Sequence, residues 1–207
     1  MLTNNIYLAL GDSISAGFGV GRKSSFPAQY YTILLPGFPG LRYINAAVDG
    51  YTSTDLARLL RANRRVANLV AQASLISISI GSNDLLALGK ALLAQQPVDV
   101  AATQNALNQN LADIGARIRS LNPRARVQAA AIYNPLPAGP FAHLFKPAQT
   151  VINQANGLLA QWSTGFGFEL VPVDQAFKGR EPLLIGPDYF HPNATGHLVI
   201  AQTFARL

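Results

Sequence analysis

The sequence predicts an α/β fold in which helices cover both faces of a five-stranded parallel sheet. Short apolar runs of strand length alternate along the chain with longer segments whose apolar residues recur at helical spacing. Parallel strands need crossover connections, and the helices in those connections cover the sheet. With 207 residues, of which 49% are hydrophobic, the chain can build a sizeable core. No internal repeat or composition shift marks a boundary, so we expect a single domain over residues 1–207.

The first half of the chain contains three predicted strands and two predicted helices. The strands lie over residues 6–10, 42–47 and 75–80, and the helices lie over residues 27–35 and 54–73. An apolar stripe runs along the second helix, and Thr52 with Asp55 three positions later makes a capping pair at its start. In the third strand isoleucines alternate with serines, whose small side chains let a helix lie close to the sheet.

The second half of the chain continues the alternation. Helices are predicted over residues 85–94, 98–121, 147–165 and 193–206, and strands over residues 126–131 and 169–173. Asn122 and Pro123 end the helix over residues 98–121, because a proline cannot continue a helix. Residues 133–147 contain four prolines and have no regular pattern.

Composition excludes several classes of protein. The chain has no cysteine, which excludes disulfide scaffolds, thiolate zinc sites and cysteine nucleophiles. No apolar run approaches the ~20 residues that a bilayer span needs, so we expect no stable membrane insertion. The first residues lack the basic stretch, apolar core and cleavage site of an export signal. We therefore expect a cytoplasmic protein, and secretion stays open for a longer precursor.

The net charge of +6 is not accompanied by a nucleic-acid-binding motif. The basic residues are mostly scattered arginines, and spacings of three and four in the single local cluster are typical of the solvated face of a helix. That cluster consists of Arg58, Arg61, Arg64 and Arg65. No aromatic residues interleave with it, so we expect no nucleic-acid partner.

Polar residues gather just after the predicted strands, where parallel α/β sheets bind their ligands. Gly11, Asp12 and Ser13 follow the first strand, residues 45–50 lie at the end of the second, and residues 81–84 (Gly-Ser-Asn-Asp) follow the third. A further loop, residues 188–192, precedes the last helix and contains an aspartate and a histidine.

A serine hydroxyl attacks an acyl carbon only when a base removes its proton, and imidazole is the usual base. Of the three histidines, His143 lies in the proline-rich loop and His197 lies inside the last predicted helix. His191 lies in a loop, three residues after Asp188. This spacing lets the carboxylate bind Nδ1 while Nε2 faces Ser13, as a catalytic triad requires.

The oxyanion that forms during acyl transfer needs hydrogen-bond donors that are already aimed at it. The sequence offers the backbone N–H groups of Ser13 and Gly50 and the side-chain amide of Asn83. Glycine lets the backbone approach the substrate closely, and asparagine supplies a neutral NH₂ group.

These four blocks, in this order over nearly the whole chain, resemble the SGNH hydrolases, also called the GDSL esterase/lipase family. The resemblance implies a flavodoxin-like, three-layer α/β/α sandwich around a five-stranded parallel sheet. It further implies a Ser13 nucleophile, an oxyanion hole that includes Gly50 and Asn83, and His191 as the base with Asp188 behind it. The substrate would be a small-molecule ester, and no cofactor would be needed.

Three more acidic residues fall on or beside the motif positions. We expect Asp12 and Asp84 to brace their loops by hydrogen bonds and to do no chemistry. Asp49 departs from the family pattern, in which a small residue is frequent before the glycine. It places another carboxylate near the site, and its effect on acyl preference stays open.

Each block alone has an ordinary explanation as a helix cap or turn, and the coincidence of all four favours catalysis. A classical α/β-hydrolase would have its serine in Gly-x-Ser-x-Gly, which is absent here. Residues 17–21 are rich in glycine but lack the spacing of either nucleotide-binding loop, so we interpret them as a mobile loop beside the nucleophile. Ser15 is interpreted as a loop or cap residue and His197 as structural, and no spacing supports a metal site.

The predicted activity is hydrolysis of carboxylic esters with short to medium acyl chains by an acyl-enzyme route. An acyl thioesterase, a lysophospholipase, a carbohydrate O-acetyl esterase and a non-catalytic binding module remain as alternatives. The proline-stiffened loop suggests that Phe141, Leu144 and Phe145 line the acyl pocket or its rim. The sequence does not predict the oligomeric state.

Overall fold

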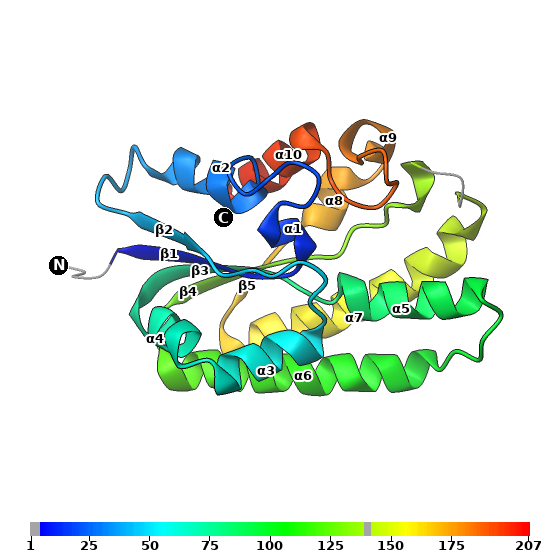
Figure 1. Cartoon of the computed structure of the whole chain (residues 1–207), viewed down its shortest axis with the longest axis horizontal. Coiled ribbons are helices and arrows are strands. Elements are labelled where there is room, and N and C mark those ends of the chain that lie inside the picture. The colour runs from blue at the N-terminus through cyan, green and yellow to red at the C-terminus, as the bar shows by residue number, and fades with distance from the viewer. Residues whose placement is uncertain (1–4, 139–141) are drawn as a thin grey trace.

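A computed structural model describes residues 5–138 and 142–207. It contains a five-stranded sheet in the order β2-β1-β3-β4-β5, and every neighbouring pair of strands is parallel. Helices cover both faces of this sheet (Figure 1), which confirms the predicted three-layer α/β/α sandwich. The strands are β1 (Ile6–Gly11), β2 (Arg42–Asn45), β3 (Ala73–Ser79), β4 (Arg126–Ala130) and β5 (Glu169–Val171).

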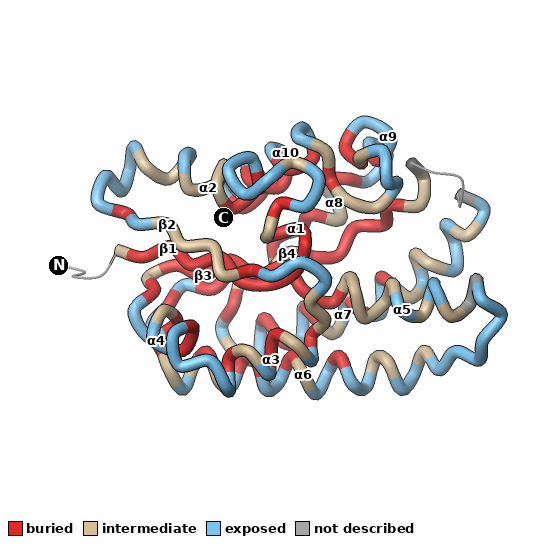
Figure 2. Tube along the Cα trace, viewed as in Figure 1, coloured by how far each residue is buried: buried red, intermediate tan, exposed pale blue. Residues whose placement is uncertain are grey.

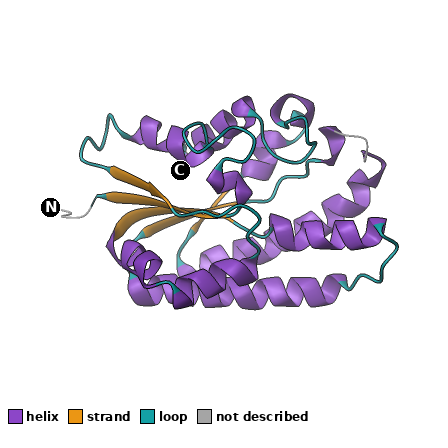
Figure 3. Cartoon of the chain, viewed as in Figure 1, coloured by secondary structure: helices purple, strands orange, loops and turns teal. Residues whose placement is uncertain are grey.

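The helices divide between the two faces of the sheet, as Figures 1 and 3 show. One face carries α1 (Ser13–Ala16), α2 (Phe26–Leu34), α8 (Val173–Phe177), α9 (Glu181–Leu184) and α10 (Ala194–Phe204). The other carries α3 (Ser53–Ala62), α4 (Arg64–Gln72), α5 (Ser82–Leu93), α6 (Val100–Leu121) and α7 (Phe145–Phe166). Two short 3₁₀ helices, η1 (Leu136–Ala138) and η2 (Ala142–Leu144), precede α7.

The core consists of one apolar cluster on each face of the sheet. β1 is buried along its whole length, and alternate side chains of a strand point to opposite faces. Leu8 therefore packs in the cluster beneath α3, α4, α6 and α7, while Tyr7 packs in the cluster beneath α2 and α10. Figure 2 shows the same pattern, with the buried segments concentrated in the sheet and the exposed ones on the outer sides of the helices.

The serines of β3 do more than make room for a helix. Ser77 is fully buried, and its hydroxyl lies 2.8 Å from the hydroxyl of Tyr7. Each group satisfies the other in an environment where an unpaired hydroxyl would be costly. The alternation of isoleucine and serine in this strand thus combines packing with buried hydrogen bonds.

The prediction of a single helix over residues 54–73 is wrong, because Asn63 divides this segment into α3 and α4. The backbone of Asn63 is extended (φ −95°, ψ 100°), and its side chain accepts a hydrogen bond from the N–H of Val66. Asparagine is a strong N-cap, so it starts a second helix where the apolar spacing alone predicted continuation of the first.

The cluster of Arg58, Arg61, Arg64 and Arg65 is exposed but extends over both helices. The capping box of Thr52 and Asp55 is confirmed.

Three short helices, α1, α8 and α9, were not predicted. Each has four or five residues, which is too few to display helical periodicity. β5 ends at Val171, two residues before its predicted end, because the backbone of Pro172 starts α8. The other predicted elements are present with shifted ends, and α6 stops at Leu121 beside Asn122 as expected.

The strand order fixes where the site lies. The chain runs outward from β1 to β2 and then returns across the sheet to β3, so β1 and β3 are neighbours that lead into different loops. In parallel sheets, ligands bind at the carboxyl ends of such strands. Gly11 and Ser79, the last residues of β1 and β3, are register partners, so both loops leave the sheet at the same level.

Within residues 5–138 and 142–207, every helix lacks the length or the apolar character that a bilayer crossing requires.

Candidate active site

The chain leaves β1 through a tight turn that presents Ser13. Gly11 has φ +119°, and a Cβ on it would collide with the carbonyl oxygen of Ser79. That same oxygen accepts a hydrogen bond of 3.0 Å from the N–H of Asp12. The close contact between β1 and β3 therefore requires glycine at position 11. The turn after β1 places Ser13 at the first position of α1.

A buried polar network holds α1 in place behind Ser13. Asp12 is fully buried, and its Oδ1 accepts hydrogen bonds from the Ser79 hydroxyl (2.6 Å) and the Ile14 N–H (3.1 Å). Because the Ser79 proton goes to Asp12, the hydroxyl of Ser15 donates to Ser79 Oγ at 2.7 Å. The expectation that Asp12 braces its loop is confirmed, and Ser15 belongs to the same network.

Burial has a marked effect on the Asp12 carboxyl. It raises the pKa of Asp12 to about 7, although the hydrogen bonds from Ser79 and Ile14 act in the opposite direction. Oδ2 of Asp12 is buried and has no hydrogen-bond partner among the described residues. A charge on this oxygen would lack compensation, which is why burial dominates.

Ser13, His191 and Asp188 form a continuous hydrogen-bonded relay. The distance from Ser13 Oγ to His191 Nε2 is 3.0 Å, and the distance from His191 Nδ1 to Asp188 Oδ2 is 2.6 Å. An ionised carboxylate can only accept, so Nδ1 carries a proton and Nε2 of the neutral ring has a free lone pair. Nε2 can therefore take the proton of the Ser13 hydroxyl.

The loop that carries Asp188 is itself fixed by hydrogen bonds. Asp188 Oδ1 accepts from the backbone N–H groups of Phe190 and His191, each at 3.0 Å. Partial burial raises the pKa of Asp188, but the hydrogen bonds from the His191 ring and from these two N–H groups outweigh it and leave the pKa below its usual value. The Tyr133 hydroxyl donates to the Phe190 carbonyl at 2.9 Å and ties the loop to the end of β4.

The predicted oxyanion donors lie in loops that are joined to one another. The N–H of Val48 donates to the Gly11 carbonyl at 3.0 Å, which fixes the loop of Gly50 beside the nucleophile turn. Asn83, in the first turn of α5, donates from Nδ2 to the carbonyl of Tyr51 at 2.9 Å. The second proton on this Nδ2 makes no hydrogen bond among the described residues, and open space lies beside the Cα of Gly50. Ser13 is the first residue of a helix, so its N–H has no acceptor within that helix.

Asp84 braces the same region. Its two oxygens accept from the Ser53 hydroxyl (2.6 Å) and the Ser53 N–H (2.9 Å), which joins the start of α5 to the start of α3. Burial raises its pKa, against the effect of these bonds. This confirms the expected structural role. Asp49 is exposed in the loop before Gly50.

The predicted acyl-pocket residues are only partly placed. Phe141 lies outside the described residues. Leu144 is half-buried at the end of η2, and Phe145 is 36% exposed at the start of α7. Their role in acyl binding stays a prediction. Sequence reasoning missed Ser79 and Tyr133, whose hydrogen bonds position the nucleophile turn and the histidine loop.

The other two histidines lie apart from the relay. His143 is exposed in η2. His197 is buried in α10, where its Nδ1 accepts a hydrogen bond from the N–H of Phe26 at 3.0 Å. This contact joins α10 to α2, in agreement with the structural role that we expected.

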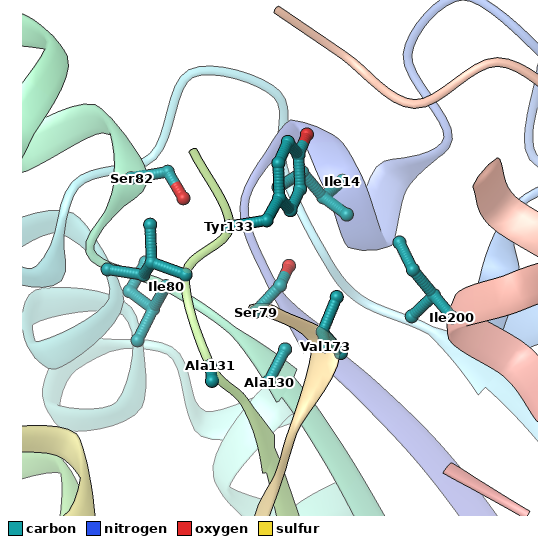
Figure 4. Close-up of a pocket in the computed structure, with 10 residues that line it drawn as sticks. Ile14, Ser79, Ile80, Ser82, Ala130, Ala131, Tyr133, Val173 and Ile200 are labelled. Carbon is teal, nitrogen blue, oxygen red and sulfur yellow. The ribbon is translucent and has the colours of Figure 1, made fainter. Parts of the chain in front are cut away.

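A small hollow lies behind α1. Figure 4 shows Ile14, Ser79, Tyr133, Val173 and Ile200 around it. Its volume is about 10 Å³, which is close to the minimum for one water molecule. The hollow is therefore too small for an organic ligand.

The chain is similar to known proteins in sequence and in fold. The model of the GDSL-like Lipase/Acylhydrolase family matches residues 9–199. The uncharacterized protein YpmR of Bacillus subtilis is 27% identical over 169 residues, which cover 76% of this chain and 62% of YpmR, less than two thirds of that relative's length.

Two solved structures have the same fold over nearly their whole length. The lipase Lip_vut3 from a goat rumen metagenome superimposes with a TM-score of 0.84 at 22% identity, covering 97% of this chain and 96% of that one. An acetylxylan esterase from Geobacillus stearothermophilus, Axe2, superimposes with a TM-score of 0.71 at 20% identity, covering 98% and 93%.

Proposed function

The chain belongs to the GDSL-like lipase/acylhydrolase family of hydrolases, and from this premise we propose that it is a serine esterase that hydrolyses carboxylic esters. The single observation that carries the proposal is the relay from Ser13 Oγ through His191 to Asp188, with distances of 3.0 and 2.6 Å. Both distances lie within the range that nucleophile, base and orienting group need.

In the first half of the proposed reaction, Ser13 Oγ attacks the carbonyl carbon of the ester. His191 Nε2 takes the hydroxyl proton, and Asp188 stabilises the imidazolium that results. The carbonyl oxygen becomes an oxyanion, which the Ser13 N–H, the Gly50 N–H and the Asn83 amide would bind. His191 then gives its proton to the departing alcohol, which leaves an acyl group on Ser13.

In the second half, a water molecule replaces the alcohol. His191 Nε2 takes a proton from the water as its oxygen attacks the acyl carbon, and the same donors bind the second oxyanion. The Ser13–acyl bond breaks, and His191 returns the proton to Ser13 Oγ. The products are the carboxylic acid and the free enzyme.

We further propose short to medium acyl chains as substrates. The hollow behind α1 is too small for an acyl group, so the chain would lie along the exposed rim of the site. That rim includes exposed apolar side chains on the loops around Ser13, among them Val48 and Tyr189. A thioester, a lysophospholipid or an acetylated carbohydrate would present the same carbonyl to Ser13, and Axe2, one of the proteins of similar fold, is an acetylxylan esterase.

Hydrolysis of p-nitrophenyl esters from acetyl to palmitoyl tests the proposal. We expect turnover that is highest for short to medium chains and that falls by orders of magnitude in Ser13→Ala. Ser24→Ala is the matched control, because Ser24 is exposed in the loop after α1 and its hydroxyl makes no hydrogen bond within the described residues. Unchanged turnover in Ser13→Ala contradicts the mechanism, and binding without turnover of any ester favours a binding module.

A further inference from the structure

The exposed side chain of Phe18 covers the ring of His191. The two ring centroids are 4.2 Å apart, and the ring planes are inclined by 36°. Phe18 is nevertheless 44% exposed, so one side of its ring contacts the histidine while much of the rest faces solvent. A large apolar side chain that is left this exposed gains little from burial, which suggests that the contact itself has a function.

The backbone of Phe18 is hydrogen-bonded to Ser13, the residue whose hydroxyl faces His191. Its N–H donates to the carbonyl of Ser13 at 3.0 Å, and the N–H of Gly17 donates to the same carbonyl at 2.9 Å. Phe18 thus holds Ser13 through its backbone and His191 through its ring. The three residues form a closed triangle, since His191 Nε2 lies 3.0 Å from Ser13 Oγ.

The turn that places the Phe18 ring is fixed by Gly17. This residue has φ +87°, and a Cβ on it would lie 2.7 Å from the Cβ of Ser25 and 2.8 Å from the carbonyl oxygen of Gly21. The N–H of Gly21 also donates to the carbonyl of Gly17 at 2.8 Å. The loop is therefore folded tightly on itself, and this fixes the backbone from which the Phe18 ring extends.

A second histidine, His197, binds the chain at Phe26, a few residues after this loop. Because Nδ1 of His197 accepts from the N–H of Phe26, the proton of the neutral ring is on Nε2. Burial lowers the pKa of His197 to about 4. Nε2 of His197 is buried and has no hydrogen-bond partner among the described residues, so the neutral ring joins α10 to the start of α2 through Nδ1 alone.

We propose that Phe18 is a positioning residue for His191, holding the imidazole against Ser13 Oγ. This inference rests on the proposed function. The edge of Phe190 contacts the histidine ring at a centroid distance of 5.0 Å, and Phe18 covers its face. Removal of Phe18 leaves the face of the imidazole open, so the ring turns more freely and spends less time in line with Ser13.

The expected kinetic effect differs from that of a substrate contact. An aromatic pair of this kind contributes enough to change a rate about 3- to 10-fold. Phe18→Ala should therefore lower kcat about 3- to 10-fold and leave KM nearly unchanged, by the same factor for every acyl length. A residue that only binds the acyl chain would instead raise KM, and more so for longer chains.

The test compares Phe18→Ala with Phe18→Tyr and with Phe38→Ala. Phe18→Tyr keeps an aromatic ring over His191 and should restore the wild-type rate. Phe38 is a matched control, because it is 54% exposed in the turn after α2. All variants are checked for folding by thermal unfolding, and we expect little change since position 18 is exposed.

The readout that does not depend on the natural substrate is the rate of labelling by an alkyl fluorophosphonate. Ser13 Oγ forms a bond to phosphorus, fluoride leaves, and His191 accepts the hydroxyl proton. We expect labelling of Ser13 to be about 3- to 10-fold slower in Phe18→Ala than in the wild type, and unchanged in Phe18→Tyr and Phe38→Ala. The His191 ring-proton resonances should shift downfield in Phe18→Ala, because they lose the ring current of the phenyl group.

The outcomes separate this inference from the proposed function. A wild type that is not labelled at Ser13 overturns the proposed function together with this inference. A wild type that is labelled at Ser13, with an unchanged labelling rate in Phe18→Ala, overturns only the positioning role. A rise in KM that grows with acyl length at constant kcat also overturns it, and so do His191 ring resonances that do not move.

Discussion

His191 Nε2 lies 3.0 Å from Ser13 Oγ, although 178 positions separate the two residues along the chain. Ser13 is placed by the turn after β1, whereas His191 is placed by a loop between α9 and α10. The Tyr133 hydroxyl joins that loop to the end of β4 by its hydrogen bond to the Phe190 carbonyl. The two reacting groups are therefore held against the same sheet by separate sets of hydrogen bonds, and each can be tested by itself.

Replacement of His191 by alanine should remove the base. We expect kcat for p-nitrophenyl acetate to fall by about 10²–10⁴-fold, because general acid–base catalysis contributes an effect of this size. The melting temperature should change little, since His191 lies in the loop between α9 and α10 and is a member of neither apolar cluster. His143→Ala is the control, because His143 is exposed in η2. Equal losses in the two variants would count against His191 as the base.

Replacement of Asp188 by asparagine should test the orientation of the imidazole. The asparagine can turn its NH₂ group toward Nδ1, which moves the ring proton to Nε2 and leaves no lone pair for Ser13. We expect kcat to fall by up to about 10⁴-fold. Asp113→Asn is the matched control, because it removes an exposed carboxylate that pairs with Arg61. Wild-type turnover in Asp188→Asn would mean that the carboxylate does not orient the ring.

The sequence was sufficient to predict the sheet and the relay because their signals are local. Ser13 and Asn83 directly follow strands, and Asp188 and His191 stand three positions apart in one loop. Ser79 gave a weaker signal. The alternation of isoleucine and serine in its strand predicted only that Ser79 lets a helix pack close to the sheet. Its hydrogen bonds to Asp12 and Ser15 depend on the register between β1 and β3.

The parts that could not be predicted depend on choices that spacing does not reveal. Asn63 fits the polar side of a continuous helix as well as it fits an N-cap, and only its extended backbone decides between them. α1, α8 and α9 are too short to show a period. Phe18 belongs to no motif, and its importance follows only from the ring of His191 beside it.

Replacement of Asn83 by alanine should remove one oxyanion donor. We expect kcat to fall by about 10²–10³-fold with a smaller change in KM, because the donor would act mainly on the charge that develops in the transition state. Steady-state kinetics on p-nitrophenyl acetate measures both constants. Asn68→Ala, in the exposed part of α4, is the control. A pure rise in KM would assign Asn83 to binding of the ground state instead.

Replacement of Asp12 by asparagine should change how stability depends on pH. Burial raises the pKa of Asp12 from 3.8 to about 7, so between these values the folded protein holds a proton that the unfolded chain has released. The free energy of unfolding therefore falls as pH rises through this window. Asparagine has no such proton, so Asp12→Asn should lose less stability than the wild type as pH rises.

Guanidinium denaturation at about pH 5 and about pH 8 measures this effect. The wild type should lose on the order of 2–3 kcal/mol more than Asp12→Asn between the two conditions, since each pKa unit corresponds to about 1.4 kcal/mol. The comparison cancels the contributions of other titrating groups. Parallel pH profiles for the two proteins would show that Asp12 titrates normally.

The covalent intermediate gives the most direct test of the proposed mechanism. Rapid acid quenching of the wild type during turnover of p-nitrophenyl acetate, followed by mass spectrometry of the intact protein and of its peptides, should find one acetyl group on Ser13. The same group should be absent from Ser13→Ala. An acetyl group on another residue, or turnover that Ser13→Ala retains at the wild-type rate, would contradict an acyl-enzyme route through Ser13.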